Sequence, residues 1–204
     1  MTIEEFNKIK EVVPNGWCSY EKARHLYQLV VEKRPYFSIE IGAFSGRSLM
    51  PIAMAHKQND EGFVLGLDAW SKKAAVKGTN DEANNQWWAG IDFSVIYSEC
   101  NNAIDHFDLN DYCGTIRLDS VLFASLIPDN TIGFMHQDGN HSEEVSCAEV
   151  EAYCDKMLIG SIWVSDDSRW PTIQRSLELL TQKGFTCLSE FPNGDNFYKV
   201  FRKK

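Results

Sequence analysis

The stretch Ser38-Ile-Glu-Ile-Gly-Ala-Phe-Ser-Gly-Arg-Ser48 constrains the fold of this 204-residue chain more than any other segment. Its apolar run, residues 38–41, is too short for a helix and stops at Gly42, so it predicts a buried strand. Apolar side chains then recur at helical spacing over residues 47–56. Glycines at positions 42 and 46 let the backbone turn and approach a ligand, and the N–H groups that open the helix can bind polar groups. The segment therefore predicts a cofactor-binding loop, with a plain connection between strand and helix as the alternative.

The spacing of these glycines separates the loop from the dinucleotide-binding fingerprint. That fingerprint needs G-x-G-x-x-G after its strand, whereas position 44 is Phe and the two glycines stand four residues apart. A nicotinamide- or flavin-dependent dehydrogenase is therefore disfavoured.

Strand and helix patterns alternate along the rest of the chain. Further strands are predicted at residues 62–68, 114–118, 132–137, 161–165, 185–190 and 197–202. Helices are predicted at residues 2–13, 19–33, 82–97, 101–107, 142–157 and 171–183. The last two strands flank Pro192-Asn-Gly-Asp195 and are expected to form an antiparallel hairpin. The order predicts an α/β fold with a doubly wound, mostly parallel sheet of seven strands.

We expect a single domain over residues 1–204, because no linker, repeat or low-complexity tract divides the chain. The helices within residues 1–35 precede the first strand and would cover one edge of the sheet or form a lid. Residues 71–111 are less regular and lie where an insertion that recognises substrate can sit. The aromatic side chains of this segment would suit an acceptor, a hydrophobic lid or the contact of a homodimer: Trp87, Trp88, Phe93 and Tyr97.

Charge and composition exclude several classes of partner. The formal net charge is −9 and the pI about 5.0, which argues against a nucleic-acid or membrane surface, because binding phosphates needs clustered Lys and Arg. No apolar stretch approaches the roughly 20 residues that span a bilayer, and the acidic N-terminus does not resemble a signal peptide. The six cysteines include no C-x-x-C pair, so free thiols are expected. Composition therefore favours a cytoplasmic protein.

Acidic residues close most of the predicted strands, at the edge of an α/β sheet where ligands bind. Asp68 stands 26 residues after Gly42, near the separation at which an acid reaches ribose hydroxyls in nucleoside-binding sheets. Asp119 and Ser120 follow the next strand and would suit an adenine amino group. The alternatives are a solvated turn aspartate at position 68 and a helix cap at position 119.

Asp138, Asp166 and Asp167 close two strands that one helix separates. The ends of adjacent parallel strands lie about 5 Å apart, so these carboxylates are expected to converge. Their repulsion would raise their pKa values or require a cation, and oxygen-only ligands favour Mg²⁺. The alternative is that the three aspartates cap the helices that follow them.

Two motifs resemble those of a known family. Glu40-x-Gly42-x-x-x-Gly46 resembles the first motif of class I S-adenosylmethionine (SAM) methyltransferases. Residues 134–143, Phe-Met-His-Gln-Asp-Gly-Asn-His-Ser-Glu, and 160–167, Gly-Ser-Ile-Trp-Val-Ser-Asp-Asp, resemble the pattern F-I-D-G-D-H-S…G-G-x-x-x-x-D-D of one such family. That family includes metal-dependent sugar O-methyltransferases of the macrocin type, and the resemblance covers about residues 16–170.

The resemblance implies a role for each site residue. Glu40 and Gly42 would hold the methionine end of SAM, Asp68 the ribose, and Asp119 and Ser120 the adenine. Trp70 would flank the adenine, with a place in the ordinary core as the alternative. The expected cofactor-binding set also includes Ser45, Gly46, Ser48 and Asp138. Mg²⁺ would be bound by Asp138, Asp166 and Asp167.

One position departs from the family pattern. Asn140 stands where some members have an acid that serves as general base, and an amide cannot take up a proton at neutral pH. His141 is the candidate for that role because its ordinary pKa suits proton abstraction, with a helix-capping or supporting hydrogen bond as the alternative. His136 lies inside a strand and is expected to be structural.

Together these features predict a Mg²⁺-dependent O-methyltransferase that acts on a hydroxyl of a small molecule such as a sugar or natural-product intermediate. A SAM- or nucleotide-binding protein without catalysis is the first alternative, because Asn140 replaces the acid. A metal-dependent hydrolase on the same scaffold is the second. The nucleoside-binding loop argues against the hydrolase.

Overall fold

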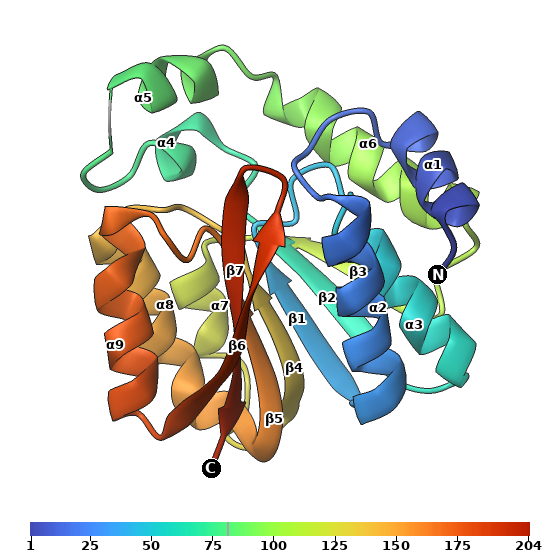
Figure 1. Ribbon diagram of the computed structural model, residues 1–204. Coiled ribbons are helices and arrows are strands. Elements are labelled where there is room, and N and C mark those ends of the chain that lie inside the picture. The colour runs from blue at the N-terminus through green and yellow to red at the C-terminus, as the bar shows by residue number, and fades with distance from the viewer. Residues whose placement is uncertain (81) are drawn as a thin grey trace.

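The computed structural model describes residues 1–80 and 82–204, and within them seven strands form one sheet (Figure 1). The strand order is β3-β2-β1-β4-β5-β7-β6, with β1 to β5 parallel and β7 antiparallel to both β5 and β6. The strands are β1 (Phe37–Ile41), β2 (Phe63–Asp68), β3 (Cys113–Arg117), β4 (Ile132–Gln137), β5 (Met157–Ser165), β6 (Phe185–Asn193) and β7 (Asn196–Lys203). This arrangement confirms the doubly wound sheet and the C-terminal hairpin.

The direction of the winding changes between β1 and β4. The chain runs outward from β1 to β2 and β3, then crosses back so that β4 pairs with the other side of β1. Ile39 of β1 lies between Leu65 of β2 and Met135 of β4. Ligands of open α/β sheets bind at such a switch point, beyond the carboxyl ends of the strands.

Helices cover both faces of the sheet because successive strand residues point to opposite sides. Phe134 packs into a core shared with α2, α3 and α6, whereas Met135 packs into a core shared with α7, α8 and α9. Figure 1 shows these helix groups on opposite sides of the sheet. The helices are α1 (Ile3–Val12), α2 (Tyr20–Lys33), α3 (Leu49–Asn59), α4 (Lys72–Ala75), α5 (Glu82–Ala89), α6 (Phe93–His106), α7 (Ser120–Ala124), α8 (Glu143–Tyr153) and α9 (Gln174–Gln182), with 3₁₀ turns η1 (Cys154–Lys156) and η2 (Pro171–Ile173).

Side-chain caps fix where several helices begin. Thr2 and Glu5 form the expected capping box of α1, and the hydroxyl of Ser19 accepts a hydrogen bond from the N–H of Lys22 at the start of α2. Ser142 caps α8 in the same way. These helix starts were predicted from the sequence.

The helix boundaries between β2 and β3 differ from the prediction. The sequence predicted helices at residues 82–97 and 101–107, whereas α5 ends at Ala89 and α6 continues without a break to His106. The carboxylate of Asp92 accepts hydrogen bonds from the N–H groups of Ser94 and Val95, so a new helix starts at Phe93.

Strand β5 also begins earlier than predicted. It starts at Met157, which was assigned to the preceding helix, because α8 ends at Tyr153 and is followed only by the short turn η1. The register with β4 shifts between Ile132 and Phe134, and Gly160 has a φ of 81° within this irregular part. A glycine bulge thus lengthens the strand.

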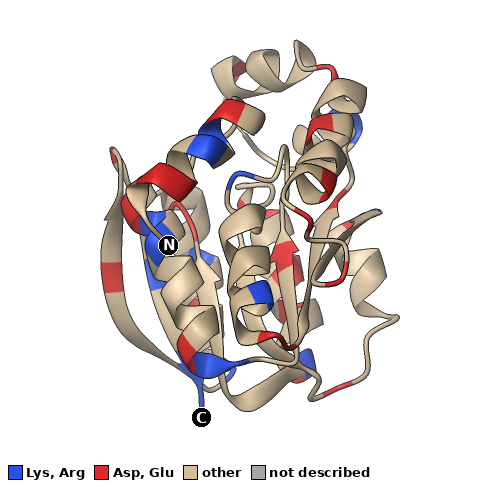
Figure 2. Ribbon diagram, turned by 90° about the vertical axis from the view of Figure 1, so that its right-hand side faces the viewer, with Lys and Arg blue, Asp and Glu red and all other residues tan. Residues whose placement is uncertain are grey.

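Helices α4 and α5 lie beyond the carboxyl ends of the parallel strands (Figure 1). In the view of Figure 2, the Lys and Arg positions stand in short, separate groups among acidic ones. Among the described residues, no helix combines the length and the apolar character that crossing a membrane requires.

Gly42, directly after β1, is in close contact with the end of β4. Its φ is 83°, and a Cβ atom there would overlap the backbone carbonyl group of Asp138 and approach the Cα of Gly139. Gly160 has nearly the same φ, but a Cβ atom there would meet no atom within 4 Å. Both glycines therefore have a left-handed backbone conformation, but only Gly42 lacks the space for a side chain.

This pair gives a test of the packing at the switch point. We expect Gly160→Ala to cost about 1–2 kcal/mol, the strain of a left-handed residue. Gly42→Ala also requires a backbone shift, and we expect it to cost about 4 kcal/mol or more. Equal losses of unfolding free energy in urea titrations would contradict the close contact.

Candidate active site

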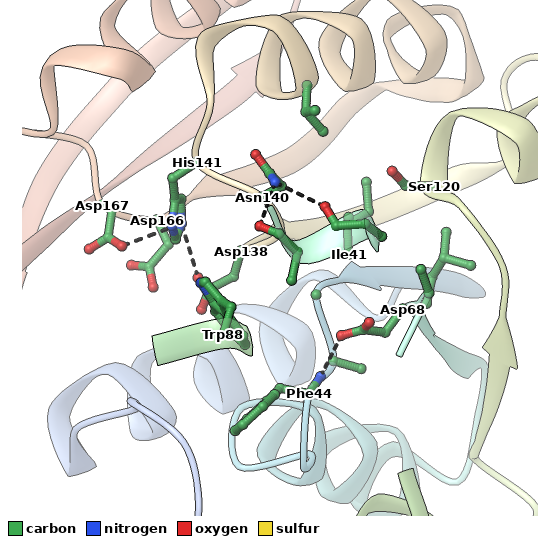
Figure 3. Close-up of a pocket in the computed structure, with 18 of the residues that line it drawn as sticks. Ile41, Phe44, Asp68, Trp88, Ser120, Asp138, Asn140, His141, Asp166 and Asp167 are labelled. Carbon is green, nitrogen blue, oxygen red and sulfur yellow. Dashed lines mark hydrogen bonds and ion pairs between the residues drawn. The ribbon is translucent and has the colours of Figure 1, made fainter. Parts of the chain in front are cut away.

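A cavity of about 410 Å³ opens above the carboxyl ends of β1, β2, β4 and β5. This volume is within the range of small-molecule sites. Ten of the predicted site residues line it: Gly42, Ser45, Ser48, Asp68, Asp119, Ser120, Asp138, His141, Asp166 and Asp167. Figure 3 labels Asp68, Ser120, Asp138, His141, Asp166 and Asp167 among them. Glu40, Gly46 and Trp70 are not among the residues that line the cavity in the part of the chain that the structure describes.

Asp68 holds the glycine loop in place. Its Oδ2 accepts a hydrogen bond from the N–H of Phe44 at 3.0 Å, and its Oδ1 accepts one from the N–H of Trp70 at 2.7 Å (Figure 3). Burial raises the pKa of Asp68, and these N–H donors oppose the rise. Each carboxylate oxygen can accept a second hydrogen bond, so Asp68 can still receive ribose hydroxyls.

Trp70 and Gly46 lie under the loop rather than beside a ligand. The Trp70 side chain is fully buried, and its indole N–H donates to the carbonyl of Phe44 at 2.8 Å. Phe44 has a φ of 47°, which is strained for a residue other than glycine, so the bonds from Asp68 and Trp70 stabilise it. Trp70 thus supports the loop from below. It does not line the cavity, so the structure shows no surface of Trp70 that an adenine in the cavity could contact. Gly46 packs against Cys100 and Met50.

Glu40 is fully buried at the centre of the sheet. It is paired in register with His136 on β4, and its Oε1 lies 2.7 Å from His136 Nδ1. Its second oxygen, Oε2, has no hydrogen-bond partner in the described part of the chain. A buried carboxylate oxygen without a partner favours a nearby water or polar ligand.

The acid cluster, Asp138, Asp166 and Asp167, lies at the ends of β4 and β5 together with His141 (Figure 3). His141 Nε2 is 3.6 Å from Asp138 Oδ1 and 3.3 Å from Asp167 Oδ2. Burial alone would lower the pKa of His141, but these two carboxylates raise it above its ordinary value. The His141 ring also lies 5.1 Å from the ring of Trp170, another residue that lines the cavity.

Lys22 was not predicted and belongs to this cluster. It is fully buried on α2, and its Nζ donates to Asp166 Oδ2 through a short hydrogen bond and to Asp138 Oδ2 at 3.2 Å. The sequence carries one signal, because Lys22 occupies the same helical face as the buried Leu26 and Val30. A lysine at such a position needs a buried acidic partner.

The predicted Mg²⁺ site can be tested against these atoms. Within the described residues, atoms that could hold a metal form two groups within 4.8 Å: His136 with Asp138 and Asp166, and Asp138 with His141 and Asp167. Neither group unites the three aspartates, and each includes an imidazole, whereas Mg²⁺ prefers oxygen ligands. Lys22 already donates to two of the carboxylates. The residues therefore do not fit Mg²⁺ in the form that the sequence predicts.

Asn140 has a structural role that its side-chain chemistry explains. Its Nδ2 donates to the carbonyls of Ala74, Ala75 and Lys77 at 2.9–3.1 Å, and its Oδ1 accepts from the N–H of Ser142. A carboxylate could not donate to these carbonyls. The amide therefore ties the loop after β4 to the α4 segment that borders the cavity.

At the other end of the cavity, Glu149 of α8 is buried beside Ser120. Its Oε1 accepts from the Ser120 hydroxyl at 2.7 Å and its Oε2 from Gln137 Nε2 at 2.8 Å. Burial raises the pKa of Glu149 to about 7, although these donors oppose the rise. Asp119 caps α7, the alternative considered from the sequence, and also pairs with Lys77 at 3.3 Å.

Aromatic rings cover the cavity near the loop. The ring centre of Trp17 lies 4.9 Å from that of Trp87 and 5.6 Å from that of Phe44, and the ring centres of Trp87 and Trp88 are 4.8 Å apart. All four line the cavity, as does Phe93, whereas Tyr97 packs against Trp70 instead. Trp17 was not among the predicted site residues. The segment that precedes Trp17 is held by Arg47, which donates hydrogen bonds to the carbonyls of residues 13, 14 and 16.

Glu149 predicts a pH dependence of stability. The pKa of Glu149 in the folded protein, about 7, exceeds its ordinary value of 4.5, so the folded state binds the proton more tightly than the unfolded state. The stabilisation that this proton provides is full below pH 4.5 and is lost as the pH rises through 7. Gln at this position does not titrate. We expect Glu149→Gln to gain about 3 kcal/mol relative to the unsubstituted protein between pH 4.5 and 8, measured by denaturant unfolding.

The control is Glu151→Gln, an exposed carboxyl on the same helix. A difference between Glu149→Gln and the unsubstituted protein that stays constant with pH would contradict the raised pKa.

Comparisons with known proteins agree with this geometry. Residues 39–168 match the family model described as a methyltransferase domain. The chain is similar in structure to an O-methyltransferase from Bacillus cereus in complex with SAH (17% identity, TM-score 0.67, covering 100% of this chain and 92% of that one). It is also similar to the O-methyltransferase TomG from Streptomyces achromogenes in complex with SAM (12% identity, TM-score 0.69, covering 100% and 91%). A search of curated proteins found no match.

Proposed function

The chain belongs to the methyltransferase-domain family, and we propose that it is a SAM-dependent O-methyltransferase acting on a hydroxyl of a small molecule. One observation carries the proposal. A single cavity is lined by the glycine loop with Asp68 on one side and by Asp138, His141 and Asp167 on the other. Cofactor and acceptor could therefore bind side by side.

The cavity fits the cofactor by size and by chemistry. Apolar side chains, among them Ile41, Leu118 and Val145, line it together with polar groups at both ends. Asp68 would accept the ribose hydroxyls, and Ser120 with Glu149 lies where the adenine is expected. The backbone of the loop after β1 would hold the methionine end. When bound, SAM supplies a methyl group on an already activated sulfonium.

The residues of the chain then have mainly to align and deprotonate the acceptor. His141 Nε2 is buried and has no hydrogen-bond partner of normal geometry within the described residues, although Asp138 and Asp167 lie close by. The neutral form of the ring could take up a hydroxyl proton from the cavity, and the two carboxylates, which raise the pKa of His141, would stabilise the imidazolium that forms. Asn140 cannot serve as base, because an amide takes up no proton at neutral pH, and its side chain holds the α4 segment instead.

The acceptor would bind between the aromatic rings and the acid cluster. Trp87, Trp88 and Trp170 present flat surfaces that can stack on a sugar face or an aromatic ring. A sugar or a natural-product intermediate is therefore the proposed class. A homodimer and a cytoplasmic location stay predictions from the sequence.

The first test of this proposal is cofactor binding. Isothermal titration calorimetry of SAM and S-adenosylhomocysteine should show a single site. Asp68→Ala should weaken SAM binding at least about tenfold, or 1.4 kcal/mol, because it removes the ribose acceptor and the support of the loop. Asp129→Ala, in an exposed ion pair before β4, should bind SAM normally. No binding of either compound would refute the proposal.

The second test separates catalysis from binding. His141→Ala should lower kcat about 100-fold, the usual contribution of a general base, while the affinity for SAM changes little. The exposed His106→Ala serves as control. Turnover is followed as S-adenosylhomocysteine release with a panel of sugars and phenols. Unchanged turnover in His141→Ala would remove His141 from the mechanism, and SAM binding without turnover of any acceptor would favour the catalytically silent alternative.

A further inference from the structure

Lys22 approaches the acid cluster from behind the cavity. It lies in the first turn of α2, and its side chain is completely buried. It is not among the residues that line the cavity in the described chain, whereas Asp138 and Asp166 are. Lys22 therefore acts on a ligand only through these two carboxylates, which makes it a positioning residue.

The start of α2 fixes the direction of this side chain. The Ser19 hydroxyl accepts from the N–H of Lys22 at 3.1 Å, and the N–H of Ser19 donates to Asn193 Oδ1 at 2.9 Å. The helix start is thus tied to the turn of the β6–β7 hairpin. Tyr198 on β7 adds a ring 5.9 Å from Lys22 Nζ.

Lys22 is held by two buried ion pairs, with Asp138 and with Asp166. Burial alone would lower its pKa, but Asp138 and Asp166 outweigh burial and raise the pKa above its ordinary value. Lys22 and His141 lower the pKa of Asp138 against the effect of burial, whereas burial and Asp138 raise the pKa of Asp166. The Lys22 ammonium group lies within ion-pair distance of both side chains, and the role of Lys22 rests on this position.

A divalent ion would compete with this ammonium group. Mg²⁺ needs carboxylate oxygens at about 2.0–2.1 Å, and Asp138 and Asp166 each already accept a hydrogen bond from Lys22 through Oδ2. A metal ion on the same carboxylates would lie within a few ångströms of a buried positive charge, where repulsion is poorly screened.

We propose that Lys22 is the resident cation of the acid cluster and takes the place of the Mg²⁺ that the sequence motif implies. The protein then binds no divalent ion at these aspartates. A second consequence rests on the proposed function: if the protein is a methyltransferase, methyl transfer proceeds in the presence of EDTA.

Metal binding by the full-length protein tests the proposal directly. Calorimetry and thermal unfolding with Mg²⁺ or Mn²⁺ should show no binding and no shift in Tm for the unsubstituted protein. Lys22→Met keeps the length of the side chain and removes the charge, so the carboxylates lose their counterion. We expect this variant to have a lower Tm that added Mg²⁺ or Mn²⁺ raises again.

The rescue distinguishes a cation role from a merely structural one. Loss of packing alone would lower Tm to the same extent with and without the metal. Lys33→Met, an exposed lysine at the end of the same helix, should show neither the loss nor the rescue. If Lys22→Met is not isolated folded, it is refolded with and without Mg²⁺ or Mn²⁺: we expect folded protein only with the metal, and equal failure in both would overturn the proposal.

Two results would overturn the proposal. One is Mg²⁺ or Mn²⁺ binding by the unsubstituted protein that Asp138→Asn abolishes. The other is a folded Lys22→Met variant whose Tm the metals do not change. Calorimetry of SAM in EDTA distinguishes failure of this proposal from failure of the proposed function. If SAM does not bind, the methyltransferase function alone is refuted. If the unsubstituted protein binds a divalent metal ion at the aspartates, the role of Lys22 alone is refuted.

Discussion

The contact between Gly42 and the backbone of Asp138 is the constraint on which the site depends. The N–H of Asp138 donates to the carbonyl of Ile41 at 2.9 Å, and the N–H of Gly42 donates to the carbonyl of Leu67 at 2.8 Å. Because no side chain separates the two strand ends, the loop after β1 lies directly against the residue that opens the acid cluster. One cavity can therefore reach both.

Buried polar groups continue from this contact into the sheet. Glu40 lies against His136, His136 Nε2 lies 3.9 Å from Asp138 Oδ2, and Asp138 is bonded to Lys22. Such a network is stable only where charges are matched, since an unpaired buried charge is costly. In this chain Lys22 supplies the positive charge beside Asp138 and Asp166, and Glu40 and His136 are held next to each other by the register of β1 and β4.

Periodicity and strand ends explain what the sequence could predict. Seven strands, their parallel order and the capped helix starts follow from local patterns, and residues such as Asp68 and Asp138 were placed correctly at the cavity because strand ends share one edge of the sheet. Local patterns do not show which distant side chains meet. Lys22 lies 116 residues from Asp138 in the chain, and a lysine on an apolar helix face is readily taken for a solvated one. For the same reason the sequence left Trp70 open between the ligand and the core, because its bond to Phe44 is formed only in the folded chain.

Asn140 shows how a motif can mislead when its letters are compared one by one. At this position an aspartate would turn a negative charge toward the carbonyl oxygens of Ala74, Ala75 and Lys77, which now receive hydrogen bonds. Placing the acid of some family members here would thus remove the hydrogen bonds that hold the α4 wall of the cavity. Asn140 and the α4 wall of the cavity therefore depend on each other, so a change at this position would alter the shape of the cavity as well as its chemistry.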